Sequence, residues 1–520
     1  MEEKRVQCSN RSTPWGTVRS AVVLTPKLRF VPPDATDKND VLNHLYIVIS
    51  IRLLTTFRLT YIGKRFLIKM RKKECKTQRS MICLIHHKPS KINGSEVLHV
   101  VNYSTLSSNL KRGILRFSAS ISKGLTRPEF KFVSQMLYGM LCKQNCHLSK
   151  IARALDEPIR LKKTIERLSR NLAAFTKGAE LLDNYVKKVK GCINDRTILI
   201  VDDSDIVKPC SKKMEALHIV RDGSTGDYGM GYHTLAVTAL TPEHKAPIGV
   251  YTRVYSAAEE RFVSADYETL KALRFIRKHF KRNNIRAFDR GYDANVYYEE
   301  LIDHKEKFVI RATKNRSVIY KGETINILKV AEQFKGKYKL RFKKKNSKQV
   351  DCKISIVPIR LCCRPNEELN LVVCRNLGQD PMMLITNMKS DDDRLAVTVT
   401  KVYLMRWRIE EFYGFKKQQF AFEDFRVRSL NSIRNLDLLL TIAIGYIGML
   451  SERAEDKRLV MELIHISKRI YDVPKFKFYA IADGICSVLA NGKQGISRFL
   501  TKRRRCGQLC LFPELFLSTA

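Results

Sequence analysis

The first clear pattern in the chain is a helical spacing of apolar residues that begins near residue 126. Three amphipathic stretches each predict a helix: RPEFKFVSQMLYGMLC (127–142), LSKIARAL (148–155) and IRLKKTIERLSRNLAAF (159–175). The breaks between them are short, and Asp156-Glu157-Pro158 ends the second stretch. The sequence therefore predicts a compact helical region before any strand.

The period then changes from that of helices to that of strands. Three strands are predicted first, then a helix, a strand, a helix and a strand: 196–205, 233–240, 246–255, 268–280, 284–291, 295–305 and 307–313. Four further strands follow without helical period: 338–345, 352–361, 369–375 and 382–388. This order predicts a mixed α/β sheet that is interrupted by a β-rich insertion.

These changes of period divide the chain into six parts. Residues 1–120 show no sustained period, so we interpret them as a basic extension of unclear structure. The apolar stretch LDLLLTIAIGYIGML is only about 15 residues long, which suits a buried core helix better than a membrane span. The other parts are a helical region, whose candidate DNA-binding role depends on the charge of the chain, a first core part, the insertion, a second core part and a basic C-terminal region: 121–190, 191–313, 314–388, 389–455 and 456–520.

The charge of the chain changes this picture most. Lys and Arg number 95 against 52 Asp and Glu, a formal net charge of +43. Nucleic acid is the leading partner for such a surplus, an anionic membrane surface is second, and a merely basic protein is third. The three helices fit either a helix-turn-helix-like DNA-binding bundle or a plain bundle with solvated basic faces. The 14 cysteines include no CxxC pair, so reduced thiols in a cytosol are favoured over zinc or disulfides.

One stretch, YLMRWRIEEFYGFKK, carries candidate chemistry on a helical frame. On a helical wheel, Tyr403, Arg406, Glu410 and Lys417 fall within an arc of roughly 60°. The apolar residues occupy the opposite side, and Glu411 lies at the rim. The wheel selects Glu410 over its neighbour. The alternative is an ordinary solvated face with an Arg406–Glu410 salt bridge.

Two acids at the ends of predicted strands favour the chemical interpretation. Asp202 follows a buried apolar run, and so does Asp289. Carboxylates at strand ends lie at an edge of the sheet, where sites form. Together with Glu410 they predict a site for hard cations, Mg²⁺ or Mn²⁺, of which two can clamp the oxygens of a phosphodiester. Asp203 is expected on the opposite face of the strand, and Asp205 is expected in a turn.

The spacing Tyr403-x2-Arg406-x3-Glu410-x6-Lys417 resembles the YREK signature of bacterial insertion-sequence transposases of the insertion-sequence-four family. VDDSDIVKP resembles the first aspartate motif of that family, and FDRGYD resembles the second. FVIRATKNR and LITN resemble the strands that border its β-domain, and CGQLCLF resembles a C-terminal ending of some members. The resemblance runs from about residue 125 to the end of the chain.

This resemblance implies a DDE transposase with a ribonuclease H-like core that a β-domain splits between the second aspartate and the glutamate. Asp202, Asp289 and Glu410 would be the catalytic residues and would hold two Mg²⁺ ions, which Mn²⁺ can replace. Such an enzyme hydrolyses the 3′ strand at the ends of its element and joins the free 3′-OH to target DNA. A metal-dependent nuclease without strand transfer and a catalytically silent DNA-binding relic stay open as alternatives.

The expected partner is double-stranded DNA, as element ends and as target, bound by a homodimer and not by a membrane protein. The expected location is the bacterial cytoplasm, in association with the nucleoid. We assign the DNA contacts to eight residues: Tyr403, Arg406, Lys417, Trp407, Arg290, Arg311, Lys314 and Arg316.

Overall fold

The computed structural model describes residues 102–500, except 212, 224, 242–245, 344–348, 390–393, 470–475, 493–494 and 497–499. The chain divides between Leu98 and His99 into two units, and all the described residues belong to the second. Most of the predicted basic extension, and the motif CGQLCLF, therefore lie outside the described residues.

Among the described residues, five helices precede the sheet: α3 (Tyr103–Ile121), α4 (Arg127–Lys143), α5 (Leu148–Leu155), α6 (Leu161–Ala174) and α7 (Gly178–Val189). The three helices predicted from period are α4, α5 and α6. The sequence left the structure of residues 1–120 open, and α3 lies almost entirely in that stretch. Its core positions Leu106, Leu110, Ile114, Phe117 and Ile121 do follow helical spacing, but serines between them dilute the signal.

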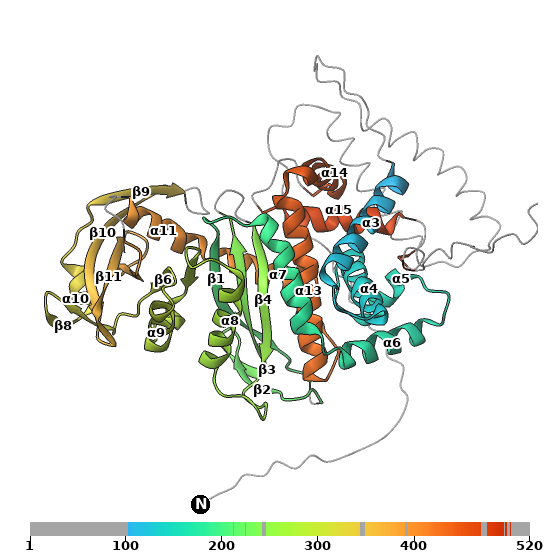
Figure 1. The fold of residues 1–520 in the computed structure, drawn as a ribbon, viewed down its shortest axis with the longest axis horizontal. Helices are drawn as coiled ribbons and strands as arrows, with labels where there is room; N and C mark the ends of the chain where they lie inside the picture. The colour runs from blue at the N-terminus through green and yellow to red at the C-terminus, as the bar shows by residue number, and fades with distance from the viewer. Residues whose placement is uncertain are drawn as a thin grey trace, which may run out of the picture. The chain divides into compact units, whose positions relative to one another are not determined.

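A mixed sheet follows, built from β1 (Ile198–Val207), β2 (His218–Arg221), β3 (Tyr228–Leu240), β4 (Pro247–Tyr255), β5 (Ile285–Phe288) and β6 (Phe308–Arg311). β3 pairs antiparallel with β1 and β4, whereas β5 lies parallel to both β1 and β6. The crossover helices are α8 (Ala265–His279) and α9 (Asn295–Asp303) (Figure 1). The prediction of a mixed α/β sheet is confirmed.

The β-rich insertion extends this same sheet. It contains β7 (Ser317–Tyr320), β8 (Glu323–Asn326), α10 (Ile327–Glu332), β9 (Tyr338–Lys343), β10 (Gln349–Leu361), β11 (Arg364–Arg375) and β12 (Met382–Thr386). β12 returns to pair antiparallel with β6, so among the described residues core and insertion share one 12-stranded sheet. The sequence did not predict α10, because six residues are too few to show a helical period.

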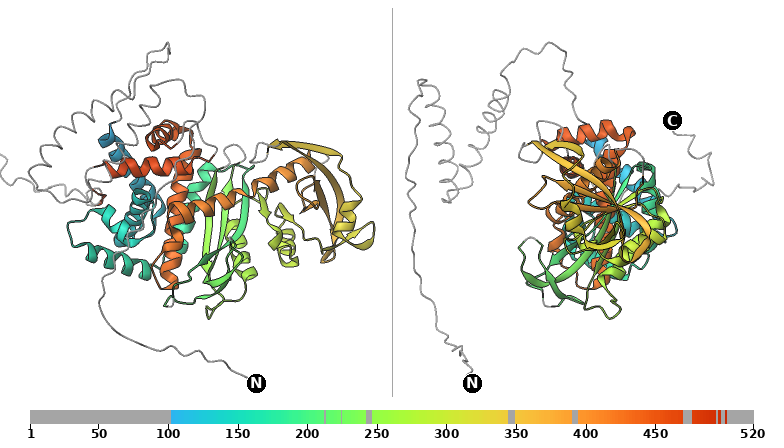
Figure 2. Two further views of the ribbon diagram at one scale, coloured as in Figure 1. Left: turned by 180° about the vertical axis from the view of Figure 1, so that it is seen from behind. Right: turned by 90° about the vertical axis from the view of Figure 1, so that its left-hand side faces the viewer.

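The chain then returns to the core through three consecutive segments, α11 (Leu395–Met405), α12 (Arg408–Gly414) and a π-helix (Phe415–Gln419). From behind, α11 lies against the strands of the insertion and α12 continues toward α13 (Figure 2). The expectation of one regular helix from Tyr403 to Lys417 was therefore wrong. The α-helical geometry is interrupted at Arg406 and Trp407, and it widens to a π-helix after Gly414.

The last helices complete the core: α13 (Leu430–Glu452), α14 (Lys457–Ser467) and α15 (Phe478–Ala490). Within the described part, α13 is the one helix long and apolar enough to cross a membrane, and 94% of its apolar window is buried inside the protein. The interpretation of 436–450 as a core helix is thus supported. α14 and α15 also bury apolar residues, so the C-terminal region is more than a basic tail.

Candidate active site

The first candidate carboxylate, Asp202, lies in the middle of β1 and not at its end. β1 continues to Val207 because it stays paired with β3 along its whole length. The parallel ladder with β5, however, ends at the pair Val201 and Phe288. Asp202 is therefore the first residue beyond the reach of β5, and this places its side chain near the chain that leaves β5.

That departing chain begins with Asp289, the second candidate carboxylate. It follows β5 directly and precedes a 3₁₀ turn, Arg290–Tyr292. The hydroxyl of Tyr403, on α11, donates a hydrogen bond to Asp289 Oδ1 at 2.9 Å. Tyr403 was expected on an exposed face, but it is 6% exposed, so a buried ring places its hydroxyl against the partly exposed carboxylate of Asp289.

Arg406 lies among all three candidate carboxylates. Its guanidinium nitrogens are 2.7 Å from Asp202 Oδ2, 3.8 Å from Asp289 Oδ2 and 3.3 Å from Glu410 Oε1. The side chain of Arg406 is 11% exposed, whereas that of Glu410 is 63% exposed. The structure thus brings together the three acids that the sequence singled out, around one arginine and open to solvent on the side of Glu410.

At both aspartates, burial raises the pKa of the carboxyl group and the positive charge of Arg406 lowers it. Loss of solvent raises the pKa of Asp202 to about 7, because the attraction of Arg406 is too weak to offset burial and the nearby charge of Asp289. Burial also acts to raise the pKa of Asp289. There, Arg406, the Arg290 amide and the Tyr403 hydroxyl outweigh it and hold that pKa below its usual value. Arg406 therefore favours the charged form of both carboxylates, but it outweighs burial only at Asp289.

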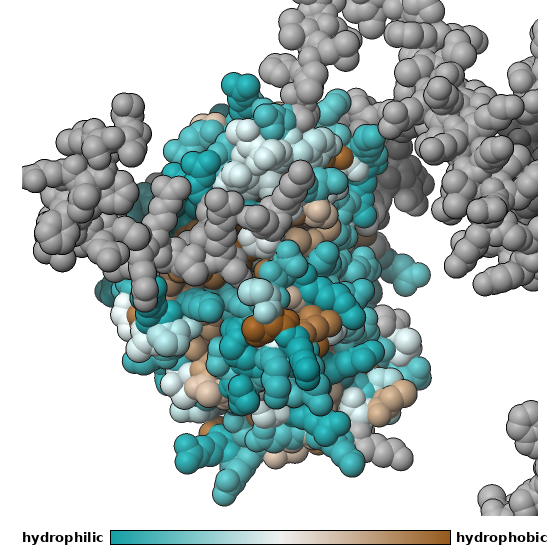
Figure 3. Space-filling model, turned by 90° about the vertical axis from the view of Figure 1, so that its right-hand side faces the viewer, coloured by the Kyte–Doolittle hydropathy of each residue, from teal (hydrophilic) through white to brown (hydrophobic). Residues whose placement is uncertain are grey.

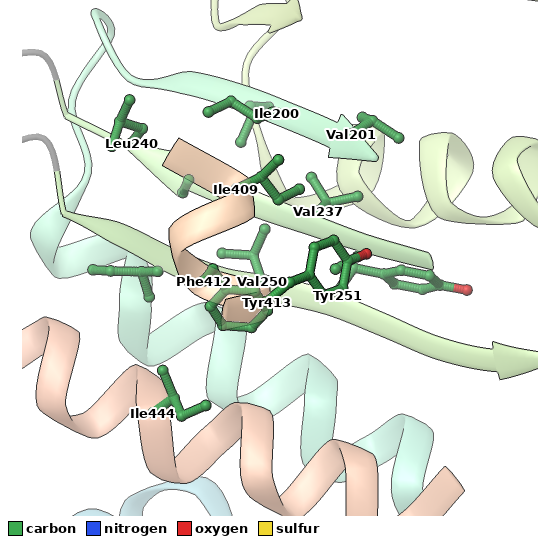
Figure 4. Close-up of a cluster of buried hydrophobic side chains, with 14 of the residues drawn as sticks. Ile200, Val201, Val237, Leu240, Val250, Tyr251, Ile409, Phe412, Tyr413 and Ile444 are labelled. Carbon is green, nitrogen blue, oxygen red and sulfur yellow. The ribbon is translucent and has the colours of Figure 1, made fainter. Parts of the chain in front are cut away.

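Packing of α12 on the sheet determines which glutamate faces the site. Ile409, Phe412 and Tyr413 pack against β1, β3 and β4, with Ile444 of α13 nearby (Figure 4). Glu410 then projects toward Arg406. Its neighbour Glu411 instead pairs with Arg408 at 2.5 Å. The choice of Glu410 over Glu411, which the helical wheel predicted, agrees with this geometry.

The π-helix after Glu410 is anchored on both sides. The buried ammonium of Lys416 pairs with Asp437 of α13. Lys417 donates to the backbone oxygen of Asp205 on β1 at 2.7 Å and pairs with Glu423 at 2.9 Å. Lys417 was expected beside Arg406 and Glu410, but the widened helix directs it along β1. Its contacts therefore hold the π-helix against β1 and Glu423.

Three other predicted DNA contacts gather beside Asp289. Arg290, Arg311 and Lys314 line a pocket of about 270 Å³, together with Asp380, which pairs with Lys314. The pocket provides an excess of positive charge next to a candidate catalytic carboxylate. Such a surface suits a phosphate group.

The remaining two predicted DNA contacts differ in accessibility. Arg316 pairs with Asp293, donates to Asn295 at 3.1 Å and packs on Tyr298, so it stabilises the turn after β6. Trp407 is 38% exposed, with Arg408 against its ring. Of these two, Trp407 alone offers an accessible face to a ligand.

The two further acids of β1 have clear partners. Asp203 points away from Asp202, as expected from strand alternation, and Tyr292 donates to its Oδ2 at 2.7 Å. Asp205 was expected in a turn, but it lies within β1 and accepts a hydrogen bond from the Gly223 amide at 3.1 Å.

Two side chains that the sequence did not single out also hold the site. The hydroxyl of Tyr413 lies 2.8 Å from the backbone oxygen of Asp202. Lys208 donates to the backbone oxygens of Glu423 at 2.6 Å and Phe425 at 2.8 Å. Lys208 stands inside the motif VDDSDIVKP, but the pattern gave no reason to expect that it contacts a segment more than 200 residues away.

The carboxylate oxygens of the site are of the chemical type that binds divalent cations. Over the described ranges, no three His, Cys, Asp or Glu side chains are arranged closely enough to hold a metal ion. The guanidinium of Arg406 instead lies between the three carboxylates. Because carboxylate oxygens are the ligands that Mg²⁺ prefers, and because they already converge on a positive charge, the residues present are compatible with a metal once Arg406 withdraws.

Comparison with known proteins places this site in a family context. Residues 193–445 match the transposase DDE domain family. The matched segment begins just before β1, ends within α13 and contains Asp202, Asp289 and Glu410. A search of solved structures finds a piggyBac transposase synaptic complex with hairpin DNA, studied by cryo-electron microscopy. It has 9% sequence identity and a TM-score of 0.39, and the alignment covers 79% of this chain and 84% of that one.

Proposed function

We propose that the protein is a DNA transposase of the insertion-sequence-four family, which cleaves DNA strands at the ends of its element and joins them to target DNA. One observation carries the proposal: within the segment that matches the transposase DDE domain, Asp202, Asp289 and Glu410 surround a single guanidinium. Three carboxylates from distant parts of the chain, gathered around one positive charge, form the kind of oxygen cluster that metal-dependent cleavage of a phosphodiester uses.

Asp202, Asp289 and Glu410 would hold two Mg²⁺ ions, or Mn²⁺ in their place. When bound, such ions stabilise charge on the attacking and leaving oxygens of a phosphodiester. Arg406 then has a second role. Once it leaves the carboxylates, its planar guanidinium is suited to bind a DNA phosphate next to the scissile bond. Tyr403 keeps Asp289 in place through its hydroxyl.

The phosphate contacts nearest the site are assigned to Arg290, Arg311 and Lys314. They share one pocket beside Asp289. Lys417 and Arg316 are assigned supporting roles, since each is already engaged by protein acceptors.

We further assign the binding of double-stranded DNA to the helical region before the sheet. A cleft of about 520 Å³ separates α5 and α6 from the segment 426–432. The face of the molecule at the right of Figure 1, where these helices lie, is mostly hydrophilic (Figure 3). Two exposed cations line the cleft and four more lie on α5 and α6, and none of the six forms an ion pair within the described residues: Arg426, Arg428, Lys150, Arg153, Lys162 and Arg170.

The ribonuclease H-like assignment and the homodimer belong to the same proposal. Support for the fold comes from strand order, since antiparallel β4, β3 and β1 are followed by parallel β5 and β6 and then by the insertion. The proposed location is the bacterial cytoplasm, on nucleoid DNA.

The test is strand cleavage of DNA that carries the ends of the element, with Mg²⁺ or with EDTA. Asp202→Ala, Asp289→Ala and Glu410→Ala should each abolish cleavage and leave DNA binding largely intact. Glu411→Ala is the matched control, because Glu411 neighbours Glu410 but pairs with Arg408. An active Glu410→Ala variant beside an inactive Glu411→Ala variant would reject the assignment.

The same assay separates the alternatives. Cleavage without any product joined to target DNA indicates a metal-dependent nuclease. Tight binding of element ends without cleavage in Mg²⁺ or Mn²⁺ indicates a silent relic.

A further inference from the structure

Asp203 forms an unusual connection on the face of β1 opposite the candidate site. Its carboxylate accepts a hydrogen bond from the hydroxyl of Tyr292 at 2.7 Å and lies 3.4 Å from that of Tyr255 on β4. Tyr292 is 5% exposed and stands three residues after Asp289. One hydrogen bond therefore joins the neighbour of Asp202 to the turn that carries Asp289.

Tyr292 holds its place independently of Asp203. Its backbone amide donates to the Asp289 oxygen at 3.1 Å, and its own backbone oxygen accepts from Ala294 at 2.9 Å. Its ring packs against Phe288 and Tyr297, with centroids 5.4 and 5.3 Å away. The hydroxyl is thus presented from a turn whose geometry is fixed to Asp289.

The position of this hydrogen bond along the chain is informative. The backbone ladder between β1 and β5 ends at Val201 and Phe288, one residue before each candidate aspartate. Beyond that point no pair of this ladder sets the distance between the two segments. The bond from Tyr292 to Asp203 is a direct link just past the end of the ladder, and it can set the spacing that the ladder no longer sets.

We propose that Asp203 and Tyr292 form a positioning pair that fixes the separation of Asp202 and Asp289. The pair touches no substrate and acts only through the backbone of its neighbours. The inference rests on the proposed function, since it concerns the same carboxylates, but it makes a separate claim about their spacing.

The decisive variants are Tyr292→Phe, Asp203→Ala and Asp203→Asn. Tyr292→Phe removes only the donor and Asp203→Ala only the acceptor, whereas Asp203→Asn keeps an oxygen that can accept from Tyr292. The matched control is Tyr298→Phe. Tyr298 is also buried and donates to Asp293 at 2.8 Å, but that bond does not reach β1.

Three quantities are measured on each full-length variant: the turnover rate for cleavage of element-end DNA, the affinity for that DNA, and the affinity for Mn²⁺ by calorimetry without DNA. Tyr292→Phe and Asp203→Ala should lower turnover on the order of 10- to 100-fold, because small misplacements of catalytic groups are costly. Their Mn²⁺ affinity should fall while DNA affinity stays near that of the wild type. Asp203→Asn should keep turnover and Mn²⁺ affinity close to those of the wild type, and Tyr298→Phe should change neither quantity.

Two results overturn the positioning role. One is wild-type turnover and Mn²⁺ affinity in Tyr292→Phe. The other is an equal fall in Tyr298→Phe, which makes the effect one of general stability. If the wild-type protein cleaves no DNA, the proposed function fails, and the Mn²⁺ affinities of the four variants still decide whether the pair positions the carboxylates.

Discussion

Arg406 shows how one side chain can serve two states of a site. Three carboxylates in a confined space repel one another unless a cation lies between them. In this protein the cation is part of the chain, with nitrogens 2.7–3.8 Å from the three acids. Arg406 thus stabilises the site without metal, and it is also the group best placed to bind DNA when metal enters.

We expect Arg406→Gln to weaken the protein without metal and to strengthen its response to metal. The loss of a charged hydrogen-bond donor should cost about 1.5–3 kcal/mol of unfolding free energy in EDTA. Mn²⁺ should then raise the melting temperature of the variant more than that of the wild type. Arg408→Gln is the control, because Arg408 pairs with Glu411 and packs on Trp407 and has no ion pair with any of the three acids. An equal Mn²⁺ effect on both variants and the wild type contradicts the idea.

Arg290 and Arg316 make a second test at the scale of single residues. Both are basic, but Arg290 follows Asp289 and lines the pocket, whereas Arg316 is paired with Asp293. We expect Arg290→Ala to reduce the slope of log K against log salt by about 0.9, as one phosphate contact is lost. Arg316→Ala should leave the slope unchanged and lower the melting temperature. The measurement is affinity for element-end DNA across a salt series.

At the scale of elements, periodic patterns were reliable where a segment packs with one face. The strands 338–345, 352–361, 369–375 and 382–388 appear as β9, β10, β11 and β12, and the crossovers appear as α8 and α9. The predicted strand 196–205 was expected to end in its acids. The sequence could not predict that β1 continues to Val207 with Asp202 in its middle, because pairing with β3 overrides the turn preference of three aspartates. Nor could it predict the π-helix, whose anchors on Asp437 and Asp205 come from distant elements.

The candidate site was predictable as a set of residue types but not as a set of contacts. Helical spacing selected Glu410, and apolar runs selected Asp202 and Asp289. That Arg406 bonds to the acids, and that Lys417 turns to β1, depends on the break in the helix at residues 406–407. A wheel drawn for a regular helix has no such break.

Helix α6 offers a test of the proposed DNA surface. Its exposed Lys162 and Arg170 lie about two turns apart on the side away from Leu168. The double variant Lys162→Ala/Arg170→Ala should weaken duplex binding and reduce the salt slope by about two. Lys187→Ala on α7 is the control, because Lys187 already pairs with Asp183. Unchanged binding by the double variant, measured by fluorescence anisotropy, assigns α6 to the plain bundle with a solvated face.

At the scale of the whole molecule, the start of α3 defines the shortest chain that should fold. Asn102 caps this helix by accepting from the Thr105 amide at 3.1 Å, and Leu106 and Leu110 lie in the core. A chain that starts at Asn102 should melt in one transition and cleave DNA. A chain that starts at Leu110 should lose about 2–4 kcal/mol, from the cap and the burial of Leu106. Calorimetry of both chains checks this, and equal melting temperatures would count against a structural role for the first two turns.

The shared ladder between β6 and β12 has a consequence for how the protein unfolds. Because Val309, Ile310 and Arg311 pair with strand residues of the insertion, the insertion has no separate sheet of its own. Its strands and those of the core must lose their order together. Urea should therefore produce a single sigmoidal transition, with a steepness set by the surface that both parts expose. Far-ultraviolet circular dichroism, which reports every strand, should follow the same curve as the tryptophan fluorescence of a Trp15→Phe variant, in which Trp407 is the one tryptophan left and reports the junction.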